Sequence, residues 1–146
     1  TGSIRIIAYE MPLRKIGKRN ESIDLLGFDE NQKPYIIELK KPTANDSIDK
    51  IIDQINSYAD CFDTIRDNVQ REVRERYLWK AFQFSKGIGK IILSSRSFFN
   101  GKQIKSFKEI GIYVCSFSGL KENFNNINIL GKCGSKGVVR LKIENR

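Results

Sequence analysis

The sequence predicts an α/β domain in which one mixed central sheet is flanked by helices. Three strand-like runs come first, at residues 4–11, 23–29 and 35–40, and each is rich in apolar, β-branched or aromatic residues. Helical and strand patterns then alternate, which gives the order β-β-β-α-α-β-α-β. A run of strands followed by such alternation is typical of a mixed sheet with helices packed on it.

The first helix is predicted from apolar residues that recur with regular helical spacing over residues 46–62. Asn45, Asp46 or Ser47 can cap its first turn. Residues 64–84 predict a second helix, whose charged face is interpreted as solvated surface.

The second half of the chain completes the sheet. Residues 90–95 and 112–117 predict two further strands, with a short basic helix at 100–109 between them. Residues 127–143 are broken by glycines and predict a closing hairpin. No internal repeat or linker divides the chain, so residues 1–146 are interpreted as a single domain.

The composition is that of a globular protein, and no apolar run is long enough to cross a membrane. The formal net charge of +9, from 26 basic and 17 acidic residues, indicates a polyanionic partner, most often nucleic acid. A soluble protein from a lysine-rich proteome is the alternative. The chain begins at Thr1 without methionine, so residues 1–3 are interpreted as a cloning remnant and a longer natural protein is left open.

The residues that are scarce restrict the chemistry. The chain has no histidine, which excludes Ser–His and Cys–His catalysis and the usual zinc hydrolases. Its three cysteines, Cys61, Cys115 and Cys133, lie far apart in the sequence. This spacing argues against a disulfide framework and favours reduced thiols in a cytoplasmic protein. Any chemistry must then depend on carboxylates, lysine and hard metal ions such as Mg²⁺.

The second and third predicted strands carry the most informative pattern. They are joined by a polar loop that ends in a proline, which suits a hairpin. If this loop is symmetric about Asn31, Asp24 lies opposite Glu38 with Cβ atoms about 4.5–5.5 Å apart, and Lys40 follows on the same face. That face is otherwise apolar. Two carboxylates there repel each other and cost desolvation unless a cation joins them.

These residues resemble the signature of the PD-(D/E)XK nuclease superfamily, an Asp on one strand followed by Glu-x-Lys on the next. The matching elements here are Ile23-Asp24 and Glu38-Leu39-Lys40. The helix that follows carries Gln54-x-x-x-Tyr58, which is similar to an element of RecB-like nucleases. The resemblance covers about residues 8–62 of this chain. It departs at Ile23, where many members have proline.

The resemblance implies a restriction-endonuclease-like fold and hydrolysis of phosphodiester bonds in DNA that depends on Mg²⁺ or Mn²⁺. The implied catalytic residues are Asp24, Glu38, Lys40 and Gln54. Asp24, Glu38 and the backbone carbonyl of Leu39 are the expected ligands of a hydrated Mg²⁺, at about 2.0–2.1 Å. Lys40 is expected to orient or deprotonate the attacking water, or to pair with charge that develops on the phosphate.

Other candidate residues each have an alternative interpretation. Glu10 is either a further metal ligand or a solvated strand residue, and Tyr58 is either a substrate contact or part of the core. A basic cluster before the Asp24 strand is expected to bind phosphates, with a solvated loop as the alternative. The nucleic-acid-binding candidates are Arg14, Lys15, Lys18, Arg19, Lys41 and Tyr58.

Two alternatives to an independently active nuclease stay open. One is a catalytically inactive nucleic-acid-binding module on the same fold, and the other is a nuclease domain that needs a DNA-recognition partner. DNA is the expected partner, and no membrane is expected. A homodimer is left open because cutting both DNA strands with one type of active site often requires two subunits.

Overall fold

The computed structural model describes residues 2–13, 21–40, 46–94, 99–121, 128–133 and 137–143, and beyond Ser116 it describes the backbone alone. These residues form seven strands and two helices in a mixed α/β arrangement, which confirms the predicted class. The elements are β1 Gly2–Pro12, β2 Ser22–Phe28, β3 Pro34–Lys40, α1 Ile48–Tyr77, β4 Gly89–Ser94, α2 Gly101–Glu109, β5 Ile112–Lys121, β6 Asn128–Cys133 and β7 Gly137–Ile143.

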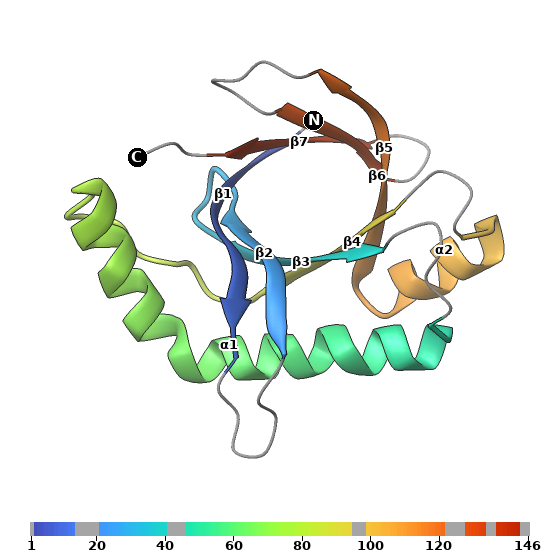
Figure 1. The fold of residues 1–146 in the computed structure, drawn as a ribbon, viewed down its shortest axis with the longest axis horizontal. Coiled ribbons are helices and arrows are strands. Elements are labelled where there is room, and N and C mark those ends of the chain that lie inside the picture. Colours follow the sequence, from blue (N-terminus) through green and yellow to red (C-terminus); the bar gives the residue numbers. More distant parts are fainter. Residues whose placement is uncertain are drawn as a thin grey trace.

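The strands form one mixed sheet that closes on itself in sequence order (Figure 1). β3, β4 and β5 run parallel to one another, and β1 closes the sheet by pairing in parallel with β7. The other neighbouring strands are antiparallel. α1 lies along the outside of the sheet, and α2 stands beside the start of α1 (Figure 1). Neither helix in the described part of the chain is long and apolar enough to span a membrane.

The hairpin between β2 and β3 has the predicted register. Leu25 pairs with Ile37 and Phe28 pairs with Pro34, which is the symmetry about Asn31 that the loop suggested. The side chain of Asp29 stabilises the turn because it accepts hydrogen bonds from the backbone N–H groups of Asn31 and Lys33, at 2.9 and 3.0 Å.

The two predicted helices at 46–62 and 64–84 are one helix of 30 residues, so the prediction of a second helix is wrong. No helix-breaking residue separates the two segments, and α1 continues until Leu78, whose φ of 57° ends it. The Ser47 hydroxyl caps its start by accepting a hydrogen bond from the Lys50 N–H. The observed order is therefore β-β-β-α-β-α-β-β-β rather than the predicted one.

The second half of α1 holds the segment that follows it. Three of its polar side chains hydrogen-bond to the backbone of residues 82–87, namely Arg66, Gln70 and Arg74. The interpretation of this face as solvated surface is wrong for these residues. Phe82 and Phe84 reach the core from this non-helical segment, because the bonds keep it along the helix.

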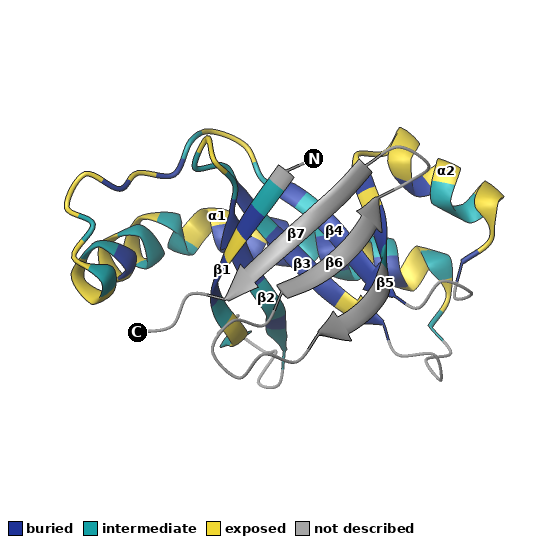
Figure 2. Cartoon of the chain, turned by 90° about the horizontal axis from the view of Figure 1, so that it is seen from above, coloured by how far each residue is buried: buried dark blue, intermediate teal, exposed yellow. Residues whose placement is uncertain are grey.

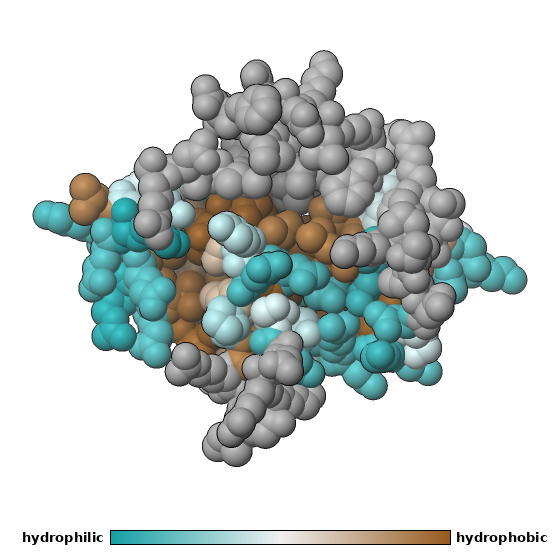
Figure 3. Space-filling view, in the orientation of Figure 1, coloured by the Kyte–Doolittle hydropathy of each residue, from teal (hydrophilic) through white to brown (hydrophobic). Residues whose placement is uncertain are grey.

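The two faces of the sheet carry separate apolar clusters. One cluster lies between the sheet and α1 and includes Leu26, Ile36 and Phe62. The other lies on the opposite face, inside the closed sheet, and includes Ile37 and Ile91. Ile36 and Ile37 belong to different clusters because successive strand residues point to opposite faces. Buried residues follow the strands in Figure 2, and hydrophobic residues gather towards the middle of the molecule in Figure 3.

The cysteines differ from the expected reduced state. Cys61 is a free, buried thiol, whereas Cys115 is disulfide-bonded. The backbone register of β5 and β6 places Cys115 opposite Cys133. This pairing depends on a strand register that the wide sequence spacing does not reveal, and the expectation of reduced cysteines is wrong for Cys115.

Gly89 is required by the close approach of β3 and β4. Its strand partner is Tyr35, and a methyl group at this position would overlap the Tyr35 ring. We expect Gly89→Ala to lower the free energy of unfolding by about 1–3 kcal/mol in urea titrations. Gly101→Ala is the control, because no neighbouring atom lies within 4 Å of the added methyl group. Equal stability of the two variants would contradict this packing.

Candidate active site

The candidate site lies where β2 begins and β3 ends, on the face that packs against α1. The backbone N–H of Leu39 donates a hydrogen bond of 2.8 Å to Asp24 Oδ2. This bond holds the Asp24 carboxylate against the end of β3, next to Glu38. Glu38 and Lys40 are both buried.

Glu38 is a buried carboxylate, and one of its two oxygens forms an ion pair with Lys40. Its side chain is 6% exposed, and Oε1 lies 3.2 Å from Lys40 Nζ. Among the described residues, Oε2 is a buried oxygen without a hydrogen-bond partner. Burial, and then the negative charge of Asp24, raise the pKa of Glu38 to about 7, although Lys40 acts in the opposite direction.

Lys40 has an acceptor for each of its three N–H groups. Nζ lies 3.2 Å from Glu38 Oε1, 3.1 Å from Asp46 Oδ2 and 3.2 Å from Gln54 Oε1. Burial by itself lowers the pKa of Lys40, but the hydrogen bond to Asp46 and the charge of Glu38 together outweigh burial, so the pKa is raised. Lys40 is therefore a charged ammonium group at neutral pH.

The Gln-x-x-x-Tyr element of α1 is joined to this lysine. Gln54 accepts from Lys40 through Oε1, and its Nε2 donates to the Tyr58 hydroxyl at 2.8 Å. Tyr58 is 3% exposed and belongs to the core between the sheet and α1. In this structure Tyr58 orients Gln54 and does not face solvent, where a nucleic-acid contact would lie.

Three polar residues at the site were not among the sequence candidates. They are Asp46, Lys50 and Ser94. The Asp46 carboxylate lies 3.1 Å from Lys40 Nζ and 3.1 Å from Lys50 Nζ, so it bridges the two lysines. Ser94 is 1% exposed and lies opposite Lys40 in the pairing of β3 with β4. The available signal for Asp46 was an acidic residue directly before the cap of the helix that follows the Glu-x-Lys strand.

Glu10 is not brought to the two carboxylates. The β1–β2 ladder pairs Tyr9 with Leu25 and Met11 with Ile23, so the Glu10 backbone is level with Asp24. However, its φ of 47° distorts the strand, and its side chain is exposed. No group of three or more His, Cys, Asp or Glu side chains that could hold a metal ion occurs in the described ranges.

Most of the expected nucleic-acid contacts cannot be placed. Arg14, Lys15, Lys18, Arg19 and Lys41 lie outside the described residues. Their role in phosphate binding stays a prediction.

The paired carboxylates fit a divalent cation. A buried carboxylate oxygen without a donor is costly, and a hard cation with oxygen ligands would satisfy it. Asp24 lies beside it and supplies a second carboxylate. Mg²⁺ is commonly bound through one or two carboxylates, with water and substrate oxygens as its other ligands, so the lack of a third acidic side chain is compatible with this ion.

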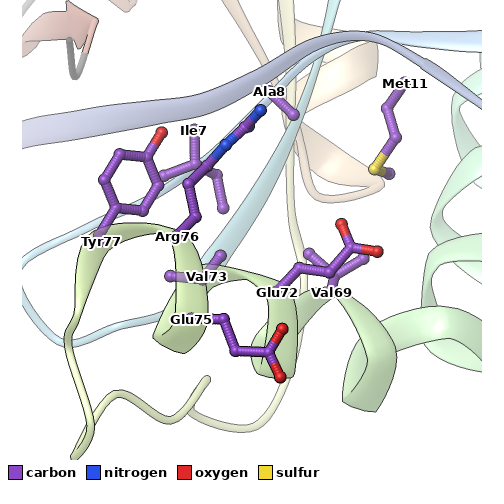
Figure 4. A pocket seen from close by; sticks show the side chains of 9 residues that line it. All are labelled: Ile7, Ala8, Met11, Val69, Glu72, Val73, Glu75, Arg76 and Tyr77. Atoms are coloured by element: carbon purple, nitrogen blue, oxygen red, sulfur yellow. The ribbon is translucent and has the colours of Figure 1, made fainter. Parts of the chain in front are cut away.

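The pocket in Figure 4 lies elsewhere, between β1 and the second half of α1. It has a volume of about 460 Å³, and none of the candidate site residues lines it. Apolar side chains such as Ile7, Met11 and Val73 form much of its wall, and Glu72 and Arg76 add charges (Figure 4). The pocket and the candidate site are therefore separate.

Comparison with known proteins leaves the assignment to the site itself: no family model, no curated protein and no solved structure matches the chain.

The raised pKa of Glu38 predicts a particular pH dependence of stability. Between the ordinary value of 4.5 and about 7, the folded protein binds more protons at Glu38 than the unfolded chain does. The free energy of unfolding should therefore fall as pH rises through this window. We expect the free energy of unfolding of Glu38→Gln, measured by urea titration in EDTA, to rise relative to that of the wild type as the pH is raised from 5 to 8. The expected change in the difference between the two proteins is about 1–3 kcal/mol.

The control for this measurement is Glu30→Gln, which removes a carboxylate from the exposed turn between β2 and β3. Its stability curve should run parallel to that of the wild type. A Glu38→Gln curve that is also parallel would show that Glu38 ionises as freely in the folded protein as in the unfolded chain.

Proposed function

We propose that this chain is a nuclease that hydrolyses phosphodiester bonds in DNA with the help of Mg²⁺ or Mn²⁺. The observation that carries the proposal is the buried Glu38 carboxylate. Within the described part of the chain one of its oxygens has no hydrogen-bond partner, Asp24 is a neighbouring carboxylate, and Lys40 lies beside the other oxygen. A buried carboxylate with an unpaired oxygen lowers the stability of the fold, so a purely structural role accounts for it poorly. Metal binding in a nuclease site would account for it.

The restriction-endonuclease-like fold is part of the same proposal. It is supported by the β2–β3 hairpin, by the position of α1 directly after β3, and by the parallel addition of β4 and β5. This arrangement brings Asp24, at the start of β2, together with Glu38 and Lys40, at the end of β3, beside Gln54. The superfamily resemblance is thus supported by the relative placement of its motif residues.

The metal would be held by Asp24, Glu38 and the backbone carbonyl of Leu39. When bound, such an ion makes a water molecule more acidic and offsets negative charge on the phosphate. The protein contributes a preformed carboxylate pair, in which the Leu39 N–H keeps Asp24 in place. Because Glu38 keeps its proton more readily than an ordinary carboxyl, loading the site is expected to release a proton below about pH 7.

Lys40 would act through its positive charge. Its raised pKa makes it a poor base in this state and a good partner for the negative charge that develops on a phosphate oxygen. Gln54 and Tyr58 hold the ammonium group in position through two consecutive hydrogen bonds. Of the roles expected for Lys40, charge stabilisation is therefore the one that the structure favours.

The alternative function is an inactive nucleic-acid-binding module on the same fold. The net charge of +9 favours binding to a polyanion whether or not the site is active. A nuclease domain that needs a DNA-recognition partner is the intermediate case. Incubation with plasmid and with linear single- and double-stranded DNA, in Mg²⁺ or Mn²⁺ and in EDTA, separates these functions. Metal-dependent cleavage by the isolated chain supports the nuclease, and binding without cleavage favours the module or the partner-dependent domain.

Lys40→Met tests catalysis most specifically, because methionine retains an unbranched side chain and loses the charge. We expect cleavage to fall by about a hundredfold or more, far more than DNA affinity falls, because one phosphate contact among many is a small part of binding. Lys90→Met is the matched control, since Lys90 is a partly buried lysine on the next strand that hydrogen-bonds to Asn56 of α1 at 2.7 Å. Cleavage by Lys40→Met at the rate of the Lys90→Met control would refute the catalytic role.

A further inference from the structure

Asp46 connects a buried cation to an exposed one. Its Oδ2 lies 3.1 Å from Lys40 Nζ, and its Oδ1 lies 3.1 Å from Lys50 Nζ. The Lys40 side chain is 6% exposed, the Asp46 side chain 28% and the Lys50 side chain 70%. The three groups therefore form a path from the interior of the site to solvent, with the carboxylate in the middle.

This arrangement leaves Lys40 without a free N–H group. Glu38, Asp46 and Gln54 occupy its three donor positions. Glu38 and Gln54 approach Lys40 from the sheet and from α1 and are fixed by burial or by Tyr58. Asp46 is more exposed than Glu38, and it precedes the Ser47 cap of α1, outside both the sheet and the helix. It is the partner that an incoming anion can replace with the least disturbance of the core.

We infer that Lys40 and Lys50 form a phosphate subsite for a nucleic-acid backbone, which the Asp46 carboxylate occupies when no nucleic acid is bound. A phosphodiester group, like a carboxylate, presents two oxygens that share one negative charge. It can therefore contact the same two ammonium groups that Asp46 bridges. The inference rests on the proposed nucleic-acid substrate and adds Lys50, which sequence analysis did not single out, to the binding residues.

Competition between Asp46 and a phosphate has a measurable consequence. Replacing Asp46 with asparagine keeps the size of the side chain and removes the competing charge. The anisotropy of a fluorescein-labelled duplex oligonucleotide, measured in EDTA, reports binding without any cleavage. We expect Asp46→Asn to tighten binding by about threefold or more, the scale of a partly exposed ion pair that no longer has to be broken.

A control is needed because any lost acidic residue increases the net positive charge. Asp53→Asn makes the same charge change at an exposed position within α1, close to Asp46 in the sequence. The inference requires Asp46→Asn to exceed Asp53→Asn in affinity. Equal affinity of the two variants, or weaker binding by Asp46→Asn, would overturn it.

Lys50 gives a second test that does not depend on how Asp46→Asn folds, because Lys50 is exposed. Lys50→Gln should weaken duplex binding more than Lys86→Gln, which removes an exposed lysine on the segment after α1. The gain from Asp46→Asn should also shrink in the Lys50→Gln background. If Lys50→Gln and Lys86→Gln bind alike, Lys50 is not part of a phosphate subsite.

These results are independent of catalysis. A chain that binds duplex DNA as described but never cleaves it would refute an independently active nuclease and leave the subsite standing. A chain that cleaves DNA but shows no specific effect of Asp46 or Lys50 would refute the subsite and leave the nuclease standing.

Discussion

The candidate site depends on the burial of the Lys40 ammonium group. Removing a charge from water costs several kcal/mol unless hydrogen bonds and opposite charges replace the lost hydration. Here the replacement comes from three places in the chain, namely Glu38 on β3, Asp46 just before α1 and Gln54 within α1. One buried cation thus joins the end of β3 to the start of α1. The geometry of the site and the position of the start of α1 thus share this interaction, while apolar residues such as Ile55 and Phe62 hold the rest of the helix against the sheet.

The described side chains around Lys40 include more acidic groups than basic ones. Asp46 can neutralise Lys40 alone, and it is held in place by Lys50 as well. The carboxylates of Asp24 and Glu38 then have no second buried cation among their described contacts. In the same described residues, one Glu38 oxygen receives no hydrogen bond. Burial, together with the negative charge of Asp24, raises the pKa of Glu38. A divalent cation would offset this negative charge, and a purely structural site would be more stable with an amide or an apolar residue at that position.

The sequence predicted local relationships well and long-range ones poorly. The register of Asp24 with Glu38 followed from a short symmetric loop, and the contact of Gln54 with Tyr58 followed from helical spacing. The helical prediction ran on to residue 84 because Phe82 fits the helical period, although it packs from a non-helical segment. The predicted break after residue 62 was wrong because no helix-breaking residue stands there. The role of Asp46 depends on how the start of α1 is placed against β3, and the bonded state of Cys115 depends on the pairing of β5 with β6. Residue spacing carries no information on either.

The central claim is that Asp24 and Glu38 together hold a divalent cation. Anomalous diffraction from crystals of the wild-type chain grown or soaked with Mn²⁺ tests it most directly, because the ion is located without reference to activity. The account predicts one strong peak in contact with an Asp24 oxygen and with Glu38 Oε2, and no such peak in Glu38→Gln crystals treated in the same way. A wild-type site without a peak, or a Mn²⁺ ion bound only at other carboxylates, would contradict it.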